Sequence, residues 1–118
     1  MGDTAVEELS PEEVSERLAA GRVLLIDVRE ATEYQAERIP GAFLYPLKTF
    51  DPAAIPADDH REVIFHCGSG MRSADAARRC LNAGRRKAVH MSGGLKAWKA
   101  AGLKVIAIDP ATGEPVGA

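Results

Sequence analysis

The 118-residue sequence has little of what would mark a secreted, membrane-spanning or metal-binding protein. It contains only two cysteines, Cys67 and Cys80, too few for a disulfide framework. No apolar run approaches the roughly 18 residues of a membrane span. The first residues lack the basic region and the apolar core of a signal peptide. No close spacing of cysteines and histidines indicates a metal site. These absences predict a single cytoplasmic domain without a metal, another cofactor or a membrane partner.

Aromatic residues are also scarce, at 5% of the chain, and few of them lie among the basic residues. This pattern does not favour nucleic acid as a partner. Charge is unevenly distributed: residues 1–59 hold thirteen acidic and five basic side chains, whereas residues 60–118 hold four and ten. The basic side chains that follow Cys67 in the sequence would attract a small anion toward it. A solvated helix face explains Arg78 and Arg79 about as well.

Apolar runs and helix signals alternate along the chain. Ser10, Pro11 and Glu13 predict a capped helix start, and Gly21 predicts the end of that helix. The run 23–26 is typical of a strand that is buried on both faces. We predict strands over 5–9, 23–26, 43–45, 62–66, 87–91 and 105–108, and helices over 11–20, 30–37, 73–83 and 95–101. This alternation predicts an α/β domain over residues 1–108 with a mostly parallel sheet, followed by a flexible tail over 109–118.

Cys67 is predicted to lie where the strand 62–66 gives way to a helix. Gly68 and Gly70 allow the backbone between them to curl tightly. Such a curl can aim several N–H groups at one point, and the following helix adds the positive end of its dipole. A cysteine at that point is expected to have a lowered pKa and to react as a thiolate. The alternative is a buried structural thiol in an ordinary turn.

Several motifs in one order match a known family: Asp27-Val-Arg-Glu30, Ile39-Pro-Gly-Ala42, Cys67-Gly-Ser-Gly-Met-Arg-Ser73 and Gly93-Gly-Leu-Lys-Ala-Trp98. The chain resembles a single-domain rhodanese, a sulfurtransferase, over about residues 5–106. This resemblance implies a rhodanese-like α/β fold, with a five-stranded sheet flanked by helices on both faces. It also implies that Cys67 takes a sulfane sulfur from a donor such as thiosulfate, carries it as a persulfide and passes it to cyanide or a thiol. A sulfur-accepting protein is a further candidate partner.

The persulfide is anionic and needs hydrogen-bond donors around it. We expect the backbone of the loop to supply them and Ser73 to cap the helix. Arg72 either holds the anionic donor or folds back onto loop carbonyls. Asp27 and Arg29 are expected to brace the loops, and Cys80 to lie in the core. The residues expected to bind the donor or the persulfide are Gly68, Ser69, Gly70, Met71, Arg72 and Ser73.

Three other functions remain open on the sequence. Tyrosine phosphatases share the motif His-Cys-x-x-Gly with a following Arg-Ser, but they need five residues between cysteine and arginine, whereas four separate Cys67 from Arg72. The same count argues against rhodanese-like cell-cycle phosphatases and arsenate reductases. A sulfur carrier or a regulatory binding module is the third alternative.

Glu37-Arg38 stands where the family usually has Gly-His, which affects the rim of the site. His66 adjoins Cys67 on a strand and is expected to face away from it.

Overall fold

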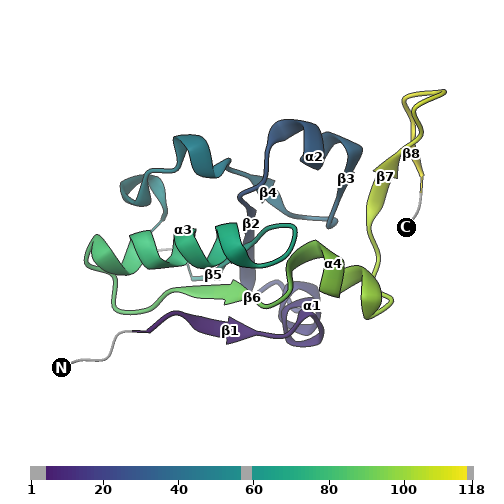
Figure 1. Ribbon diagram of the computed structural model, residues 1–118. Coiled ribbons are helices and arrows are strands. Elements are labelled where there is room, and N and C mark those ends of the chain that lie inside the picture. The colour runs from purple at the N-terminus through teal and green to yellow at the C-terminus, as the bar shows by residue number, and fades with distance from the viewer. Residues whose placement is uncertain (1–4, 57–59, 117–118) are drawn as a thin grey trace.

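The computed structural model describes residues 5–56 and 60–116, in which strands and helices alternate (Figure 1). No helix in these ranges is long and apolar enough to cross a membrane. Two single 3₁₀ turns, Leu47–Thr49 and Pro52–Ala54, interrupt the long connection after β4. The elements are β1 Glu7–Leu9, α1 Pro11–Ala19, β2 Val23–Asp27, α2 Ala31–Ala36, β3 Glu37–Arg38, β4 Phe43–Leu44, β5 Glu62–His66, α3 Met71–Asn82, β6 Val89–Met91, α4 Gly94–Ala100, β7 Ile106–Ile108 and β8 Pro115–Val116.

The main sheet has five parallel strands in the order β1-β6-β5-β2-β4. β2 is buried over its whole length, as its continuous apolar run predicts. In register, Phe65 of β5 lies between Ile26 of β2 and His90 of β6. This sheet confirms the predicted five-stranded α/β architecture. Because its strands are parallel, the loops that follow β2, β5 and β6 meet at one edge.

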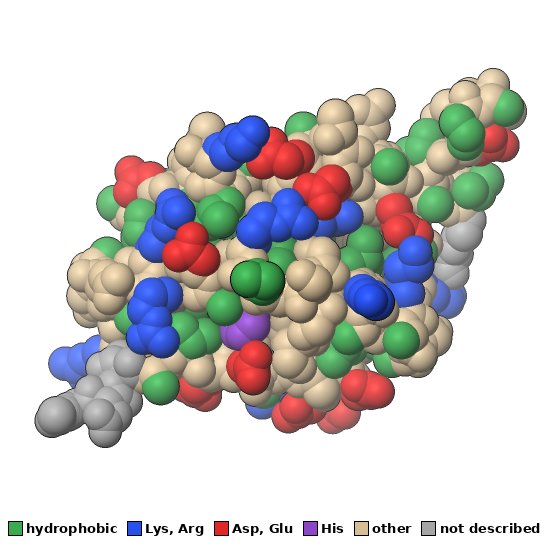
Figure 2. Space-filling model, viewed as in Figure 1, with side chains coloured by type: hydrophobic (Ala, Val, Ile, Leu, Met, Phe, Trp, Pro, Cys, Tyr) green, Lys and Arg blue, Asp and Glu red, His purple; other side chains and the backbone are tan. Residues whose placement is uncertain are grey.

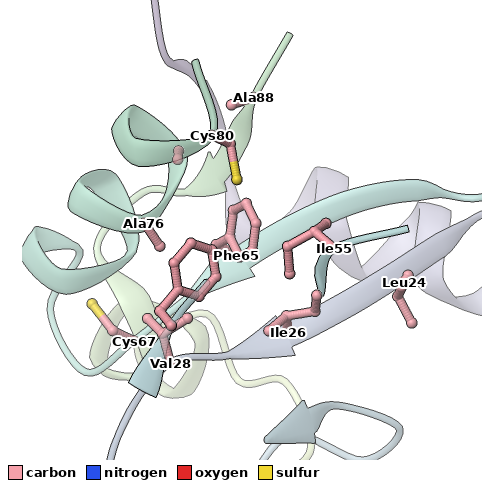
Figure 3. Packing of buried hydrophobic residues seen from close by; sticks show 11 residues of the cluster. Leu24, Ile26, Val28, Ile55, Phe65, Cys67, Ala76, Cys80 and Ala88 are labelled. Atoms are coloured by element: carbon pink, nitrogen blue, oxygen red, sulfur yellow. The ribbon is translucent and has the colours of Figure 1, made fainter. Parts of the chain in front are cut away.

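Helices cover both faces of this sheet, as predicted. On one face, α3 and the 3₁₀ turns pack on one set of alternate strand residues (Figure 1). Figure 3 shows this cluster, with Cys67 near the beginning of α3 and Cys80 near its end. On the other face, α1 and α4 pack on the intervening residues, with Val14 and Trp98 fully or almost fully buried. Neighbouring residues on a strand thus enter different cores, which places Cys67 on the α3 face.

The first helix begins as the sequence predicts. The Ser10 hydroxyl accepts a hydrogen bond from the Glu13 N–H, and the Glu13 carboxylate accepts one from the Ser10 N–H. Gly21 follows α1 with φ at +72°, the left-handed conformation that glycine adopts at helix ends. This reciprocal cap confirms the predicted start, and it orients α1 against the sheet.

The C-terminal part differs from the prediction in its pairing. The predicted strand at 105–108 forms β7, which leaves the main sheet and pairs antiparallel with β3 and β8. β8 lies inside the segment predicted as an irregular tail, because the turn at 109–113 folds the chain back on β7. Figure 1 shows this hairpin beside α4, beyond the end of the main sheet toward which the β6 arrow points. Residues 117 and 118 lie outside the described residues, so the flexibility of the tail stays a prediction.

Candidate active site

Cys67 follows β5 directly, and its side chain has no exposed surface. Its Sγ accepts hydrogen bonds from the backbone N–H groups of Gly70, at 3.1 Å, and Ser73, at 3.3 Å. Gly70 is the N-cap of α3, at φ +109°, and has no side chain to satisfy the first N–H groups of the helix. The sulfur therefore does what the oxygen of a capping side chain does at other helices. The loop curls around the sulfur as the two glycines predict.

The surroundings of Cys67 change the acidity of its thiol. Burial raises the pKa, but the Ser73 hydroxyl and the N–H groups of Ser73, Gly70 and Ser69 together lower it below the ordinary value. For Cys80, burial raises the pKa of the thiol, and Arg85 offsets this only in part. Thiolate is the reactive form of cysteine, so the two thiols differ in the direction expected of a nucleophile and a core residue.

Contacts with the start of α4 fix the position of the Cys67 loop. The N–H of Leu95 donates to the Cys67 carbonyl at 2.8 Å, and the N–H of Lys96 donates to the Gly68 carbonyl at 3.1 Å. These bonds bring the backbone of Gly94 so close that an added Cβ would lie 2.5 Å from the Cys67 oxygen. Gly94 also has φ at +61°. Glycine is therefore required at position 94 by this close approach as well as by the left-handed conformation.

Ser73 does not cap α3, contrary to the prediction. The helix starts at Met71, two residues earlier than predicted, and Ser73 is its third residue. Its hydroxyl oxygen lies 3.5 Å from Cys67 Sγ and 3.2 Å from the Gly70 carbonyl oxygen. The prediction failed because Gly70 and the cysteine sulfur already occupy the capping position. Ser73 is buried next to the sulfur instead.

Arg72 is directed to a carboxylate and is not folded back onto the loop carbonyls. Its guanidinium donates two hydrogen bonds, at 2.8 and 3.1 Å, to the carboxylate of Glu33 on α2. These hydrogen bonds hold the pKa of Glu33 at about 2, although partial burial of the carboxyl opposes the shift. Arg72 Nη2 also passes over the loop, 3.2 Å from where a Cβ on Gly68 would lie. The arginine thus stands at the rim of the loop with its charge paired.

Two further loop residues, Ser69 and Met71, lie at the surface. Ser69 is exposed, and Met71 exposes 81% of its surface, so neither side chain is held by packing. Beside the loop lies a hollow of about 270 Å³ lined by Glu37, Gly68, Leu95, Lys96 and Lys99. Lys99 is paired with Glu37 at 2.9 Å. Glu37, where the family usually has glycine, therefore places a carboxylate on this rim.

Asp27 and Arg29 form a buried ion pair behind the loop. The Asp27 carboxylate accepts bonds from the Arg29 backbone and guanidinium at 2.8 to 3.0 Å. Arg29 also donates to the Glu37 carbonyl at 2.6 Å. His66 Nε2 lies 3.5 Å from Asp27, on the face opposite Cys67. Burial lowers the pKa of His66, and the nearby Asp27 carboxylate opposes this shift only in part. These positions fit the bracing role expected of Asp27 and Arg29.

Comparison with known proteins gives the family. The rhodanese-like domain family matches residues 10–101. The chain belongs to this family. A sulfurtransferase of Allochromatium vinosum is 34% identical, over an alignment that covers 86% of this chain and 96% of that protein. The structure of thiosulfate sulfurtransferase from Pseudomonas aeruginosa superposes with a TM-score of 0.71, is 31% identical and covers 85% of this chain and 20% of its own.

Other similar proteins differ in length and in description. The chain spans 55% and 24% of the lengths of the first curated relatives it matches. A structure from Rhodopseudomonas palustris, described as a possible tyrosine phosphatase, is 26% identical, covers 82% of each chain and has a TM-score of 0.69. These proteins share the fold of this rhodanese-like domain, and their descriptions name different functions.

The structure adds one residue to the site that the sequence reasoning missed. His90 of β6 is buried, and its Nδ1 lies 2.9 Å from the Ser73 hydroxyl oxygen. Its Nε2 lies 3.0 Å from the carboxylate of Glu8 on β1. A histidine on a strand between two apolar residues was the available signal, but only the strand order brings it to Cys67. Among residues 5–56 and 60–116, no group of three or more histidine, cysteine or acidic side chains is placed to hold a metal.

The buried ion pair of this rhodanese-like domain leads to a stability prediction. We expect Arg29→Met to lower the free energy of unfolding by about 3–5 kcal/mol, because it leaves the Asp27 carboxylate buried without its partner. Arg79→Met is the matched control, since Arg79 forms an exposed pair with Asp75, and about 0.5 kcal/mol is expected there. Urea unfolding of both variants measures the difference. Equal losses would mean that the Asp27–Arg29 pair is not a brace.

Proposed function

We propose that this protein is a sulfurtransferase that moves a sulfane sulfur through a persulfide on Cys67. The observation that carries the proposal is the convergence of the Gly70 and Ser73 N–H groups on Cys67 Sγ. The lowered pKa of the thiol supplies the thiolate. Relatives named sulfurtransferase and sulfur carrier support the same class of reaction.

The proposed reaction has two steps. The Cys67 thiolate attacks the outer sulfur of a small anionic donor such as thiosulfate. A new S–S bond forms, the donor S–S bond breaks and sulfite leaves with its electron pair. A thiophilic acceptor, cyanide or a thiol, then attacks the outer sulfur of the persulfide. The product is thiocyanate or a new persulfide, and Cys67 returns as thiolate.

The loop supports this chemistry by its size. N–H groups at 3.1 and 3.3 Å from Sγ stabilise charge near the sulfur itself. A phosphoryl group carries its oxygen atoms farther from Sγ and would meet the loop sterically. With four residues between Cys67 and Arg72, the loop favours a donated sulfur over a phosphate. Because Cys67 has no exposed surface, residues around the loop have to move before a donor can contact Sγ.

A direct assay separates the proposed enzyme from a phosphatase. We expect the protein to form thiocyanate from thiosulfate and cyanide, and to hydrolyse para-nitrophenyl phosphate no faster than a Cys67→Ser variant. Hydrolysis that depends on Cys67, without thiocyanate formation, would mean that the protein is a phosphatase and not a sulfurtransferase. Binding of thiosulfate without turnover would favour a binding module.

The Arg72–Glu33 pair predicts opposite effects of two substitutions on the donor. Glu33 competes with an anionic donor for the guanidinium, so Glu33→Gln should lower the KM for thiosulfate by roughly threefold. Arg72→Ala should raise it about tenfold, since a hydrogen bond to a charged group is lost. Steady-state kinetics with varied thiosulfate measure both. If both variants raise KM equally, the pair braces α2 against the loop and does not bind the donor.

A further inference from the structure

The side chains behind Cys67 form a continuous hydrogen-bonded path that the proposed sulfur transfer does not yet use. The path runs from Cys67 Sγ to the Ser73 hydroxyl at 3.5 Å, and from there to His90 Nδ1 at 2.9 Å. It ends at the Glu8 carboxylate, 3.0 Å from His90 Nε2. Apart from Cys67, which follows β5, the residues of the path come from three elements far apart in sequence, β1, α3 and β6. Each link joins groups that can exchange a proton.

The protonation state of His90 follows from its two neighbours. An ionised carboxylate only accepts hydrogen bonds, so Glu8 requires a proton on Nε2 of His90. Nδ1 of the neutral ring is then an acceptor, and the Ser73 hydroxyl donates to it. The Gly70 carbonyl competes for the same hydroxyl proton, but at 3.2 Å it is the longer contact. Ser73 in turn can accept the thiol proton of Cys67.

We propose that Ser73 and His90 form a proton relay that removes the thiol proton of Cys67 and holds it as an imidazolium beside Glu8. The Cys67 proton passes to the Ser73 oxygen while the Ser73 proton passes to His90 Nδ1. The result is a thiolate, a hydroxyl that now donates to it, and an imidazolium whose Nδ1–H donates to the hydroxyl. No heavy atom has to move, and the number of protons is unchanged.

The charges around His90 favour this relay. Glu8 contacts the ring from β1, and Asp75 and Arg78 of α3 line the same hollow of about 410 Å³ as Glu8 and His90. The β5 residue paired with His90 is the apolar Phe65. Figure 2 shows acidic and basic side chains mixed over this face, with a histidine between them. Asp75 is itself paired with Arg79, so the groups that favour the imidazolium are Glu8, which contacts the ring, and the nearby thiolate.

The burial along the path supplies a way out for the proton. His90 exposes only 4% of its surface, whereas the Glu8 side chain exposes 61%. The proton is thus held away from water at the ring but can leave through the carboxylate into the hollow. Ser73 touches the reacting sulfur, and His90 acts through Ser73 as a positioning residue. The relay rests on the proposed role of Cys67 as nucleophile, but it concerns thiol ionisation and not sulfur transfer.

Cysteine alkylation as a function of pH tests the relay without any sulfur donor. His90→Asn keeps a hydrogen-bonding group near the position of Nδ1 but cannot take up a proton. We expect the midpoint of the iodoacetamide rate of Cys67 to rise by at least about one pH unit, and the rate at pH 7 to fall about tenfold. Glu8→Gln should shift the midpoint in the same direction by less. The control is His60→Asn, an exposed histidine beside the opposite end of β5.

Reciprocal linkage gives a second readout that needs no His90 variant. If His90 and Cys67 share a proton equilibrium, the NMR titration of the His90 ring must change when Cys67 becomes serine. We expect the ring to titrate at lower pH in Cys67→Ser, because the neighbouring thiolate is lost. An unchanged alkylation profile in His90→Asn, or an unchanged His90 titration in Cys67→Ser, would overturn the relay. Absence of thiocyanate formation with the relay intact would contradict only the proposed function.

Discussion

Replacing Cys67 by serine will reduce thiocyanate formation from thiosulfate and cyanide by at least roughly 1,000-fold, the scale of loss seen when a nucleophile is removed. The physical reason is that only this sulfur lies where the Gly70 and Ser73 N–H groups converge. A serine hydroxyl at this position has a far higher pKa and cannot carry a sulfane sulfur. Initial rates at several thiosulfate concentrations measure the effect.

The second cysteine provides the matched control. Cys80→Ala removes a buried thiol at the other end of α3, where burial raises the pKa and the sulfur packs in the apolar cluster (Figure 3). We expect this variant to keep most of the activity and to lose only a modest amount of stability. Comparable loss of activity in the two variants would mean that the roles of the two cysteines are assigned wrongly.

Gly94→Ala is expected to have the second largest effect, although Gly94 carries no side chain. A Cβ there would lie 2.5 Å from the Cys67 oxygen and from the Gly68 carbonyl carbon. The left-handed φ adds about 1–2 kcal/mol of strain for any other residue. Because backbone cannot move aside as a flexible side chain can, the Cys67 loop must shift. We expect a loss of about 3 kcal/mol or more in unfolding free energy and about 100-fold in activity.

Gly102→Ala measures the effect of the left-handed backbone strain without a steric clash of the added Cβ. Gly102 follows α4 with φ at +76°, but nothing lies within 4 Å of its added Cβ. This variant should lose only about 1 kcal/mol and keep its activity, since the strain alone remains. Urea unfolding and the thiocyanate assay on both variants give the comparison. If Gly102→Ala is as damaging as Gly94→Ala, the close approach of α4 to the loop is not what positions Cys67.

The sequence predicts the architecture well because its local signals agree. The run at 23–26, the cap at Ser10 and Glu13 and the glycines around Cys67 each identify an element or its boundary. The α3 face of Cys67, opposite His66, follows from the alternation of side chains along a strand. The position of Cys67 in the fold could therefore be predicted before any tertiary contact was known.

Contacts between distant segments could not be predicted in the same way. The pairing of Arg72 with Glu33 joins residues 39 positions apart, and neither residue differs locally from a solvated charge. The contact of His90 with Glu8 spans 82 positions and depends on β1 lying next to β6. The predicted role of Ser73 was wrong because a cysteine sulfur accepts the hydrogen bonds at the start of α3. The capping patterns behind the prediction include no cysteine. Similarly, β7 was predicted as a strand, but its partners β3 and β8 are too short to give a recognisable sequence pattern.

Mass spectrometry of the protein after incubation with thiosulfate shows whether Cys67 accepts one sulfur atom. We expect a gain of one sulfur atom, located on the peptide that contains Cys67 and absent from Cys67→Ser. Added cyanide should remove it and release one thiocyanate per sulfur lost. A folded protein that gains no sulfur from thiosulfate or mercaptopyruvate, or gains it equally in Cys67→Ser, would contradict this expectation.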